Sequence, residues 1–459
     1  MAGIGFELVH LLKKNTYGGL LQAFSLTTLI SVGPGLLVIL SLGIVCSFSL
    51  FAIPTVQTTR QFLSVVIFLF SSSMIISSLL QYTFVRFMAD LLFLKQFDLI
   101  TPNFLGVLLV QLLVSIGIAL PATFYFFADY NVILKLLLVS NFVILCLIWI
   151  STVLLTGFDS YKQLVWAFVI GYTSMILVHF VFESQQNELV FLLFEFLLAQ
   201  CILFALLVRA IIDFYPSNIL IQFQFLKKEN VYYTLIVANF FYNLGFWIDK
   251  YLFWFNPETS YSIFPPLRLS PIYDLPMFIS SLTIIPGFAV FMLQIESKFS
   301  LIFPKVMDTI FKRKTLAEID AVCNELILSG REALYSLIKT QALVTVIVFL
   351  SVLFVFSVFN ITTIYLNLLL ILIVGASLNV ILWGLISMLY YMTQYHHALY
   401  VTFIFVSCNF LFTEASLYAG PLYFGYGLSF SLLLANIFAF YFLDKDFKDI
   451  EYTAFMMVD

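Results

Sequence analysis

The chain has 459 residues, of which 62% are hydrophobic and 10% are charged, and its mean hydropathy is +1.07. Soluble proteins carry about 25% charged residues, so this composition excludes a soluble globular protein. The net charge of −4 is too small to indicate a nucleic-acid partner. The apolar residues occur in blocks of roughly 20 or more, the length that crosses a hydrocarbon core of about 30 Å. They predict a polytopic membrane protein.

The first segment, residues 1–19, precedes the first long apolar block. Within it, Ile4, Leu8 and Leu11 or Leu12 recur at helical spacing along one face. A helix with a single apolar face lies in the plane of the membrane interface rather than across the bilayer. We therefore expect an interfacial amphipathic helix over residues 1–19.

Twelve apolar spans follow, six on each side of a basic connection, YPSNILIQFQFLKKEN, at residues 215–230. The spans cover residues 20–48, 61–81, 103–127, 132–156, 165–183, 190–214, 231–256, 275–297, 338–359, 361–390, 398–419 and 422–443. Two halves joined by a basic linker are typical of transporters built from related bundles with a site between them. We expect an all-α fold with six-helix bundles at 20–214 and 231–443 around a central cavity, a cytoplasmic linker between them and a tail at 444–459.

The distribution of Lys and Arg predicts the orientation. Cytoplasmic connections of membrane proteins are enriched in these residues. If both termini are cytoplasmic, the exceptions among the 21 positive residues are Arg60, Lys135, Lys250 and Arg268. The sequence therefore predicts a multi-pass membrane protein with an N-in, C-in topology.

The longest cytoplasmic connection, residues 298–337, has helical features. Thr315 and Glu318 have the spacing of a capping box, and Gly330 is expected to end the helix. An apolar periodicity runs between them at Leu316, Ile319, Val322 and Leu326. We expect a cytoplasmic helix here, either simply solvated or interfacial, or used as a docking surface for a partner protein. The docking interpretation would use the basic residues Lys312, Arg313 and Lys314.

The seventh span contains FYNLGFWIDKYLFWF at residues 241–255, with two charges inside it. At about 100° per residue, its polar and small residues share one arc. These are Asn239, Tyr242, Asn243, Gly245, Asp249 and Lys250. Adjacent residues on a helix do not face each other, so Asp249 and Lys250 are not expected to neutralise one another.

A charge at the centre of a membrane helix costs about 2.5–3.5 kcal/mol on insertion scales, so Asp249 and Lys250 are expected to have a polar surrounding. We interpret the polar arc as a face that lines a hydrated cavity on the substrate path. The alternative is an interhelical contact in which Asp249 pairs with a cation on a neighbouring helix.

Two spans contain residues that break helices. Gly33, Pro34 and Gly35 lie near the middle of the first span, and Pro286 and Gly287 lie in the eighth. Proline removes a backbone hydrogen bond and glycine lowers helix stability, which predicts kinks or unwound turns. Transporters form sites and bend at broken helices near the membrane midplane, so these positions are candidate gates. A static kink that packing requires is the alternative.

Other acidic residues lie in or beside the spans. Asp274 fits the N-cap of the eighth span, with Pro276 close behind, and is also a candidate for the substrate path. Glu195 and Glu414 lie deeper in their spans and are candidates for cavity lining or proton handling. Of the histidines, His179 lies deep in a span.

Motifs for catalysis or cofactor binding are missing. The sequence contains neither a GxxxxGK phosphate-binding loop nor an HExxH motif. A DxD pattern at residues 444–446 lies in the tail without a surrounding domain. We therefore expect no enzymatic activity, no catalytic residues, no cofactor and no metal, and transport is favoured over catalysis.

Several segments resemble a known family. They are GIGFEL at 3–8 with LLKK after it, the Ser31-x-Gly33-Pro34 turn, FYNLGFWIDK at 241–250, SPIYDLPMF at 270–278, and IIPGFAVF at 284–291 with Glu296 and Phe299. The chain resembles the PelG family of inner-membrane proteins of Pel exopolysaccharide systems. That family lies in the polysaccharide-transporter branch of the multidrug/oligosaccharidyl-lipid/polysaccharide flippase superfamily.

The resemblance implies export of a growing hexosamine-rich polysaccharide across the cytoplasmic membrane. It implies partnership with a cytoplasmic glycosyltransferase and two further membrane proteins of the Pel system. It also implies that the first and seventh helices act as gates, and a carboxylate such as Asp249 would suit a polymer with free amino groups. The alternatives are a cation-coupled transporter for a small solute, a non-conducting scaffold for the synthase, and an intramembrane acyl- or glycosyltransferase.

Overall fold

The computed structural model describes residues 16–31, 33–51, 56–156, 161–181, 189–312, 314–359 and 363–449. In these ranges the chain is helical apart from short connections and a two-stranded antiparallel hairpin. Ten helices among the described residues are long and apolar enough to cross a membrane. The all-α, multi-pass expectation is therefore confirmed. Most of the expected interfacial helix, residues 1–15, and residues 450–459 of the expected tail lie outside the described residues.

The chain divides into two compact units. The N-terminal unit comprises Val32–Asn243 and Trp254–Leu269, and the C-terminal unit comprises Met1–Ser31, Leu244–Phe253 and Ser270–Asp459. This grouping differs from the expected bundle boundaries at the first and seventh spans. The helix Tyr17–Ser31 of the first span packs against the helix Ile285–Gln294 of the C-terminal unit, and the seventh span contributes residues to both units. The six-plus-six division of the membrane helices stays a prediction.

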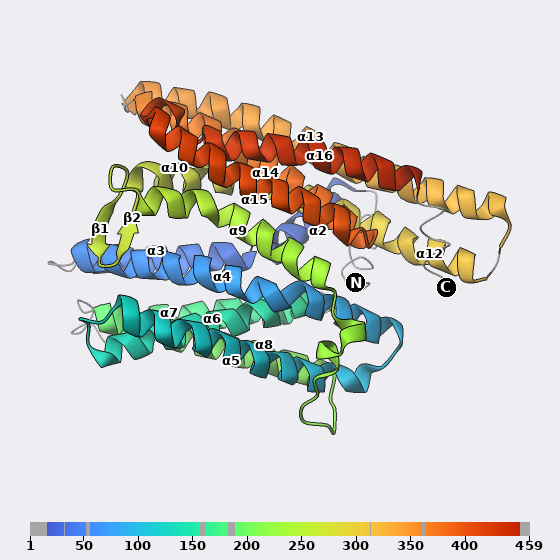
Figure 1. Cartoon of the computed structure of the whole chain (residues 1–459), viewed down its shortest axis with the longest axis horizontal. Helices are drawn as coiled ribbons and strands as arrows, with labels where there is room; N and C mark the ends of the chain where they lie inside the picture. The colour runs from blue at the N-terminus through green and yellow to red at the C-terminus, as the bar shows by residue number, and fades with distance from the viewer. Residues whose placement is uncertain are drawn as a thin grey trace. The chain divides into compact units, whose positions relative to one another are not determined.

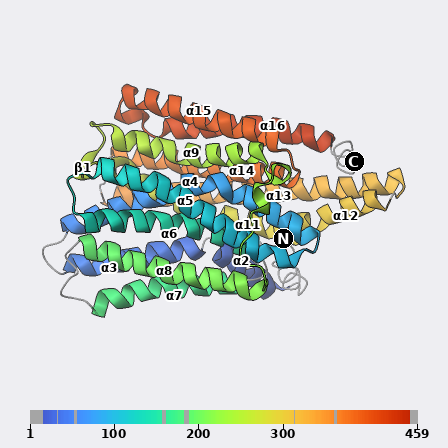
Figure 2. The ribbon, with the colours of Figure 1, turned by 60° about the horizontal axis from the view of Figure 1, so that its bottom comes forward.

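Seven helices supply the N-terminal unit. They are α3 (Gly33–Phe51), α4 (Val56–Phe93), α5 (Ile100–Phe126), α6 (Val132–Thr156), α7 (Tyr161–Val181), α8 (Leu189–Phe214) and the first half of α9 (Tyr233–Phe255). α6 packs against α4, α5 and α8, and α7 packs against α3 and α8 (Figures 1 and 2). Large apolar side chains such as Phe62, Phe104 and Phe196 fill the core. Other apolar residues on these helices are exposed, as expected where a helix faces lipid.

The linker after α8 is fixed to the N-terminal unit. The backbone N–H of Gln222 donates to the Pro102 carbonyl at 3.0 Å, and that of Gln224 donates to Oδ1 of Asn103 at 2.8 Å. Gly106 of α5 lies so close that a Cβ there would be 2.0 Å from the Gln222 carbonyl oxygen. Two short 3-10 turns, Gln224–Leu226 and Lys228–Asn230, lead into α9.

A β-hairpin follows α9. It pairs β1 (Tyr261–Phe264) with β2 (Leu267–Leu269), and a cis peptide joins Pro265 to Pro266 between them (Figure 1). Phe264 is buried against Phe127 and Tyr130. The hairpin therefore belongs to the N-terminal unit although it follows the seventh span.

The C-terminal unit contains the remaining helices. They are α2 (Tyr17–Ser31), α10 (Pro271–Leu282), α11 (Ile285–Gln294), α12 (Ser300–Phe311), α13 (Leu316–Phe359), α14 (Thr363–Tyr391), α15 (Tyr395–Ala419) and α16 (Tyr426–Lys448). A π-helical turn at Ile295–Phe299 joins α11 to α12. α16 packs against both α14 and α15, while α10 packs against α14 and α11 packs against α13.

One of the two predicted helix interruptions is present. In the first span, α2 ends at Ser31 and α3 begins at Gly33, but residue 32 between them lies outside the described residues, so a break there stays a prediction. The eighth is divided between α10 and α11, and Pro286 lies in the first turn of α11, where a missing N–H costs no helical hydrogen bond. Their role as gates stays a prediction.

The expected helix after Thr315 is present but is much longer than predicted. Glu318 accepts hydrogen bonds from the Thr315 backbone N–H at 3.1 Å and from its hydroxyl at 2.9 Å, so the capping box is confirmed. The predicted end at Gly330 is wrong, because α13 continues without a break to Phe359. Gly330 is instead a point of close packing, where a Cβ would lie 3.1 Å from Phe447 and 3.3 Å from Phe299.

Candidate functional site

The polar residues in the first half of α9 lie within the N-terminal unit. Nδ2 of Asn239 donates to the carbonyl oxygen of Ser78 on α4 at 2.7 Å. Asn243, one turn later, donates to the backbone carbonyl of Asn239 at 2.9 Å and to its side-chain oxygen at 3.2 Å. Both amides are buried, and Tyr242 lies between them in the sequence, half-buried. These side chains form a chain of amides that joins α9 to α4.

The α4 helix supplies a group of serines that the sequence analysis missed. Within about two turns it carries five of them, Ser71, Ser72, Ser73, Ser77 and Ser78. Each hydroxyl donates to a carbonyl three or four residues earlier in the same helix. The SSS run and the SS pair inside an apolar span could have indicated a helix contact, since small polar residues are typical of helix contacts in membranes.

Asp249 and Lys250, in the second half of α9, form a buried ion pair. The ammonium nitrogen of Lys250 lies 3.1 Å from Oδ1 of Asp249, and the two side chains are 6% and 0% exposed. The expectation that adjacent residues would not meet is therefore wrong. The Lys250 side chain folds back along the helix, where its ammonium also donates to the Phe246 carbonyl at 2.6 Å and lies over the Phe246 ring. The long lysine stem brings the charge back to its neighbour.

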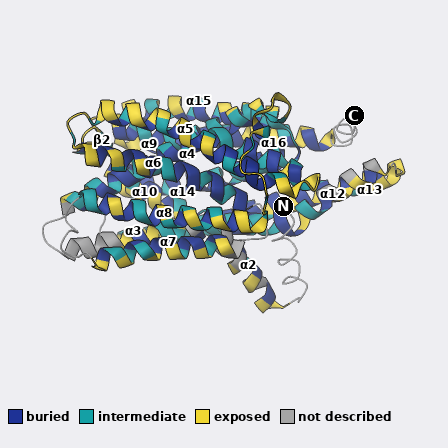
Figure 3. Ribbon diagram, turned by 90° about the horizontal axis from the view of Figure 1, so that it is seen from below, coloured by how far each residue is buried: buried dark blue, intermediate teal, exposed yellow. Residues whose placement is uncertain are grey.

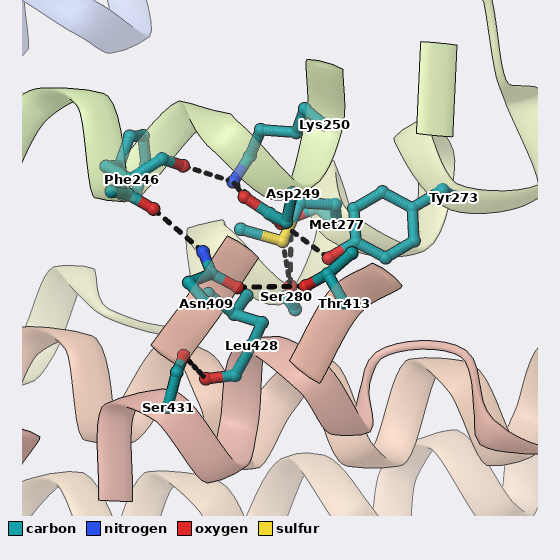
Figure 4. A network of polar contacts seen from close by, with 11 residues as sticks. Phe246, Asp249, Lys250, Tyr273, Met277, Ser280, Asn409, Thr413, Leu428 and Ser431 are labelled. Atoms are coloured by element: carbon teal, nitrogen blue, oxygen red, sulfur yellow. Dashed lines mark hydrogen bonds and ion pairs between the residues drawn. The ribbon is translucent and has the colours of Figure 1, made fainter. Parts of the chain in front are cut away.

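Tyr273 of α10 completes this cluster. Its hydroxyl donates to Oδ2 of Asp249 at 2.5 Å (Figure 4). Its ring stacks on Phe253 with centroids 3.9 Å apart. The carboxylate of Asp249 thus receives hydrogen bonds from both Lys250 and Tyr273, which reduces the cost of burying it. Sequence analysis missed Tyr273, because the contact joins two helices and no local pattern reveals it.

Asp274, next to Tyr273, caps α10 in a different way from that predicted. The helix begins at Pro271, three residues before Asp274, and Ser270 occupies the N-cap position. Asp274 lies within the first turn, and its Oδ2 accepts a hydrogen bond from the Ser270 backbone N–H at 2.9 Å. The N-cap assignment was therefore wrong, whereas a capping contact is present and holds the start of the helix that carries Tyr273.

A second polar contact fixes α9 to α15. Nδ2 of Asn409 donates to the Gly245 carbonyl at 2.8 Å, and Thr413 donates to Oδ1 of Asn409 at 2.9 Å (Figure 4). Gly245 allows the approach, since a Cβ there would lie 2.7 Å from the Phe405 ring. Gly245 therefore serves close helix packing, and Asn409 and Thr413 join the candidate site as residues that the sequence analysis missed.

The remaining predicted residues belong to other elements. Pro286 and Gly287 lie at the start of α11, and Gly33, Pro34 and Gly35 lie at the start of α3 in the other unit. Of the predicted docking residues, Lys312 is exposed and pairs with Asp308 at 2.8 Å, and Lys314 is also exposed. Arg313 lies outside the described residues.

The N-terminal unit holds a second buried titratable pair. Nδ1 of His179 on α7 lies 3.1 Å from Oε2 of Glu195 on α8, and both side chains are fully buried. Oε1 of Glu195 has no hydrogen-bond partner among the described residues. Among those residues, no group of three or more His, Cys, Asp or Glu side chains has the arrangement of a metal site.

The fold is similar to those of solved transporters. It matches an outward-facing multidrug resistance MATE family transporter of the MOP superfamily with a TM-score of 0.63 and 14% identity, over 99% of this chain and 100% of that one. A MATE transporter in complex with MaD5 matches at a TM-score of 0.61 and 12% identity, over 94% and 96% of the two chains. A MOP superfamily transporter from Pyrococcus furiosus matches at a TM-score of 0.56 and 13% identity, over 93% of this chain and 95% of that one. The chain has the fold of a MATE-type transporter.

The sequence comparison with protein families is more specific. Residues 1–455 match the family described as “PelG: Putative exopolysaccharide Exporter (EPS-E)”. The chain belongs to this family, which confirms the resemblance seen in its motifs. It is a multi-pass inner-membrane protein of an exporter family rather than an enzyme. No protein with a curated description matches the chain in sequence.

Proposed function

We propose that the chain moves a growing, hexosamine-rich, Pel-like polysaccharide across the cytoplasmic membrane, together with a cytoplasmic glycosyltransferase and the other membrane proteins of that system. The observation that carries the proposal is the buried cluster of Asp249, Lys250 and Tyr273 in a chain of the exopolysaccharide exporter family. Buried ionisable residues in membrane helices are expensive, and they are retained chiefly on substrate or ion pathways.

The chemistry of the cluster fits a neutral sugar better than a cationic one. Lys250 offsets the charge of Asp249, so the cluster is close to neutral and offers no standing anionic site. Carboxylate, ammonium and phenol groups instead provide donors and acceptors for sugar hydroxyl and acetamido groups. The polymer therefore passes this point with its amino groups still acetylated, and the expectation that Asp249 attracts free amines is set aside.

Sugar contact requires a conformational change. Asp249 and Tyr273 are fully buried, so substrate reaches them only when α9 or α10 moves. The interruption between α10 and α11 begins nine residues after Asp274, and the contact between Asn409 and Gly245 anchors the same part of α9. Broken helices are where transporters bend, so the helix break serves as the gate for this cluster.

The experiment is polymer export from cells that lack the chain and carry variants in its place. Asp249→Asn leaves Lys250 buried without its counter-ion, so this variant alone mixes folding with function. The double variant Asp249→Asn, Lys250→Met removes both charges and restores neutrality. Export, amount of protein in the membrane and recruitment of the glycosyltransferase are measured for each variant.

We expect the double variant to reach the membrane and recruit the glycosyltransferase, but to export little polymer. Normal export by the double variant would remove the cluster from the polymer route. Loss of recruitment and export together, with normal protein levels, would favour a scaffold that does not conduct polymer. Export of a small solute by reconstituted protein, with no effect on polymer, would favour a small-solute transporter.

A further inference from the structure

The α13 helix is far longer than a membrane crossing. It has 44 residues, which corresponds to about 66 Å of helix, whereas the hydrocarbon core is about 30 Å thick. Its second half, from about residue 338, is the apolar span, so its first half projects out of the membrane. Figures 1 and 2 show α12 and this half of α13 extending beyond α14 and α15. The positive-inside expectation places this projection in the cytoplasm.

One face of the projecting half is held firmly to the rest of the C-terminal unit. Ile319, Cys323 and Leu326 are buried on its inner side. Phe447 of α16 packs against Gly330, and Arg331 pairs with Asp444 of α16 at 3.9 Å. The projection is therefore a preformed support, and a partner that binds it has little chain to order.

The outer face carries two parallel lines of exposed residues. Ala321, Leu328 and Tyr335 recur every seven residues, and the side chains of Leu328 and Tyr335 are 59% and 68% exposed. Glu318, Glu325 and Glu332 also recur every seven residues and are exposed. We call these six residues the α13 seam. Figure 3 shows exposed and buried residues alternating along this part of the helix.

The spacing keeps the two lines side by side. Positions seven residues apart differ by only about 20° in direction around a helix, so each line stays on one face over two heptads. Each glutamate lies three residues before a member of the apolar line and is its neighbour on the helix surface. An apolar line flanked by charges is the pattern with which one helix receives another.

The charge of the seam selects among its possible partners. Anionic lipid headgroups are repelled by the glutamates, and a second copy of the seam would place like charges opposite each other. A helix with an apolar line flanked by Lys or Arg complements both the apolar line of the seam and its line of glutamates. Lys298 pairs with Glu332 at 2.9 Å within the chain, so the cations of a basic partner would meet chiefly Glu318 and Glu325.

We propose that the α13 seam docks a basic amphipathic helix of a cytoplasmic protein. The proposal rests on the proposed function, since a polymer exporter that works beside a cytoplasmic glycosyltransferase needs a surface on which to hold it. It places the docking surface on the acidic outer face of α13, whereas the sequence suggested the basic turn around Lys312 and Lys314.

The test uses the full chain in zwitterionic nanodiscs and two labelled peptides. Both peptides are helices of about three heptads with leucine at the core positions, flanked in one by lysine and in the other by glutamate. Binding is followed by fluorescence anisotropy, and binding to empty nanodiscs is subtracted. The seam variants are Glu325→Lys and Leu328→Ser. The matched controls are Glu229→Lys and Leu226→Ser, which change exposed residues of the linker in the same way.

We expect the lysine peptide to bind the wild type about tenfold or more tightly than the glutamate peptide, with a strong dependence on salt. Each seam variant should weaken that binding by about tenfold, and neither control should change it. Equal binding by seam and control variants, or equal binding of the two peptides, would overturn the proposal. The assay involves no transport, so a failure here is separate from a failure of polymer export, which is measured in cells.

Discussion

Gln341 of α13 donates a hydrogen bond to the carbonyl oxygen of Thr283, at the interruption between α10 and α11, with a nitrogen–oxygen distance of 3.2 Å. The same amide nitrogen donates to the hydroxyl of Ser377 on α14 at 3.1 Å. Gly287 faces the oxygen of the same amide group, and a Cβ at Gly287 would lie 2.4 Å from Oε1 of Gln341. Gln341 therefore holds the break between two neighbouring helices, in a space that only glycine leaves open.

Gly287→Ala should destabilise the protein by about 1–3 kcal/mol, because the buried amide must move and give up its hydrogen bonds. Gln341→Ala should also destabilise it, but the two changes together should cost less than their sum, since the second removes the clash that the first creates. Thermal unfolding in detergent measures the three variants. Gly117→Ala is the control, because nothing lies within 4 Å of a Cβ at that position. Additive costs would show that Gly287 and Gln341 do not constrain each other.

Adding a methyl group at Gly106 should detach the linker from α5. A Cβ at Gly106 would lie 2.0 Å from the carbonyl oxygen of Gln222, and neither backbone can move aside easily. We expect Gly106→Ala to increase the rate of trypsin cleavage after Lys227 and Lys228 by about tenfold, because cleavage requires local unfolding of the linker. Gly117→Ala, on the same helix, should leave the cleavage rate unchanged. Equal rates for both variants would mean that the linker is held by other contacts.

Removing one partner of the His179–Glu195 pair should lower the stability of the protein more than removing both. Glu195→Leu leaves the buried imidazole without the carboxylate 3.1 Å away, and we expect a loss of about 1–3 kcal/mol in stability. Glu195→Gln keeps a hydrogen-bonding group and should cost less. The double variant His179→Phe, Glu195→Leu should recover part of the loss, because no polar group is then stranded. Thermal unfolding distinguishes these cases, and a double variant that is less stable than either single would contradict the argument.

The sequence predicted the features that depend on local chemistry. The helix break beside Pro286 follows from the residues themselves, and the capping box of Thr315 and Glu318 needs only their spacing. The seventh span, expected at 231–256, is present as the helix α9, but α9 is not among the ten helices apolar enough to span a membrane, because its polar and charged residues lower its hydropathy. These features could therefore be read before any contact was known.

The parts that the sequence missed depend on contacts between distant residues. Tyr273 reaches Asp249 across two helices, and Asn409 reaches Gly245 over 164 positions. Gly330 resembles a helix end in the sequence, but close approach of Phe447 from the last helix explains the glycine. The ion pair of Asp249 and Lys250 was excluded by a rule that treats side chains as pointing straight outward, whereas the lysine stem folds back along α9.

Gly245 lies where the packing of α9 against α15 meets the candidate polymer route. A Cβ at this position would lie 2.7 Å from the Phe405 ring and 3.3 Å from the Cα of Val406. The ring can move but the backbone cannot, so Gly245→Ala should push α9 away from α15 and stretch the 2.8 Å hydrogen bond from Asn409. We expect a loss of about 1–3 kcal/mol in stability together with reduced export.

Phe405→Leu removes the larger part of the clash and should recover stability in the double variant Gly245→Ala, Phe405→Leu. Thermal unfolding and export are measured side by side, with Gly117→Ala as the control for an added methyl group. If the double variant recovers both stability and export, Gly245 serves only helix packing. If stability returns while export stays low, the position of α9 against α15 itself matters for transport, because the same short segment carries Asp249 and Lys250 to Tyr273.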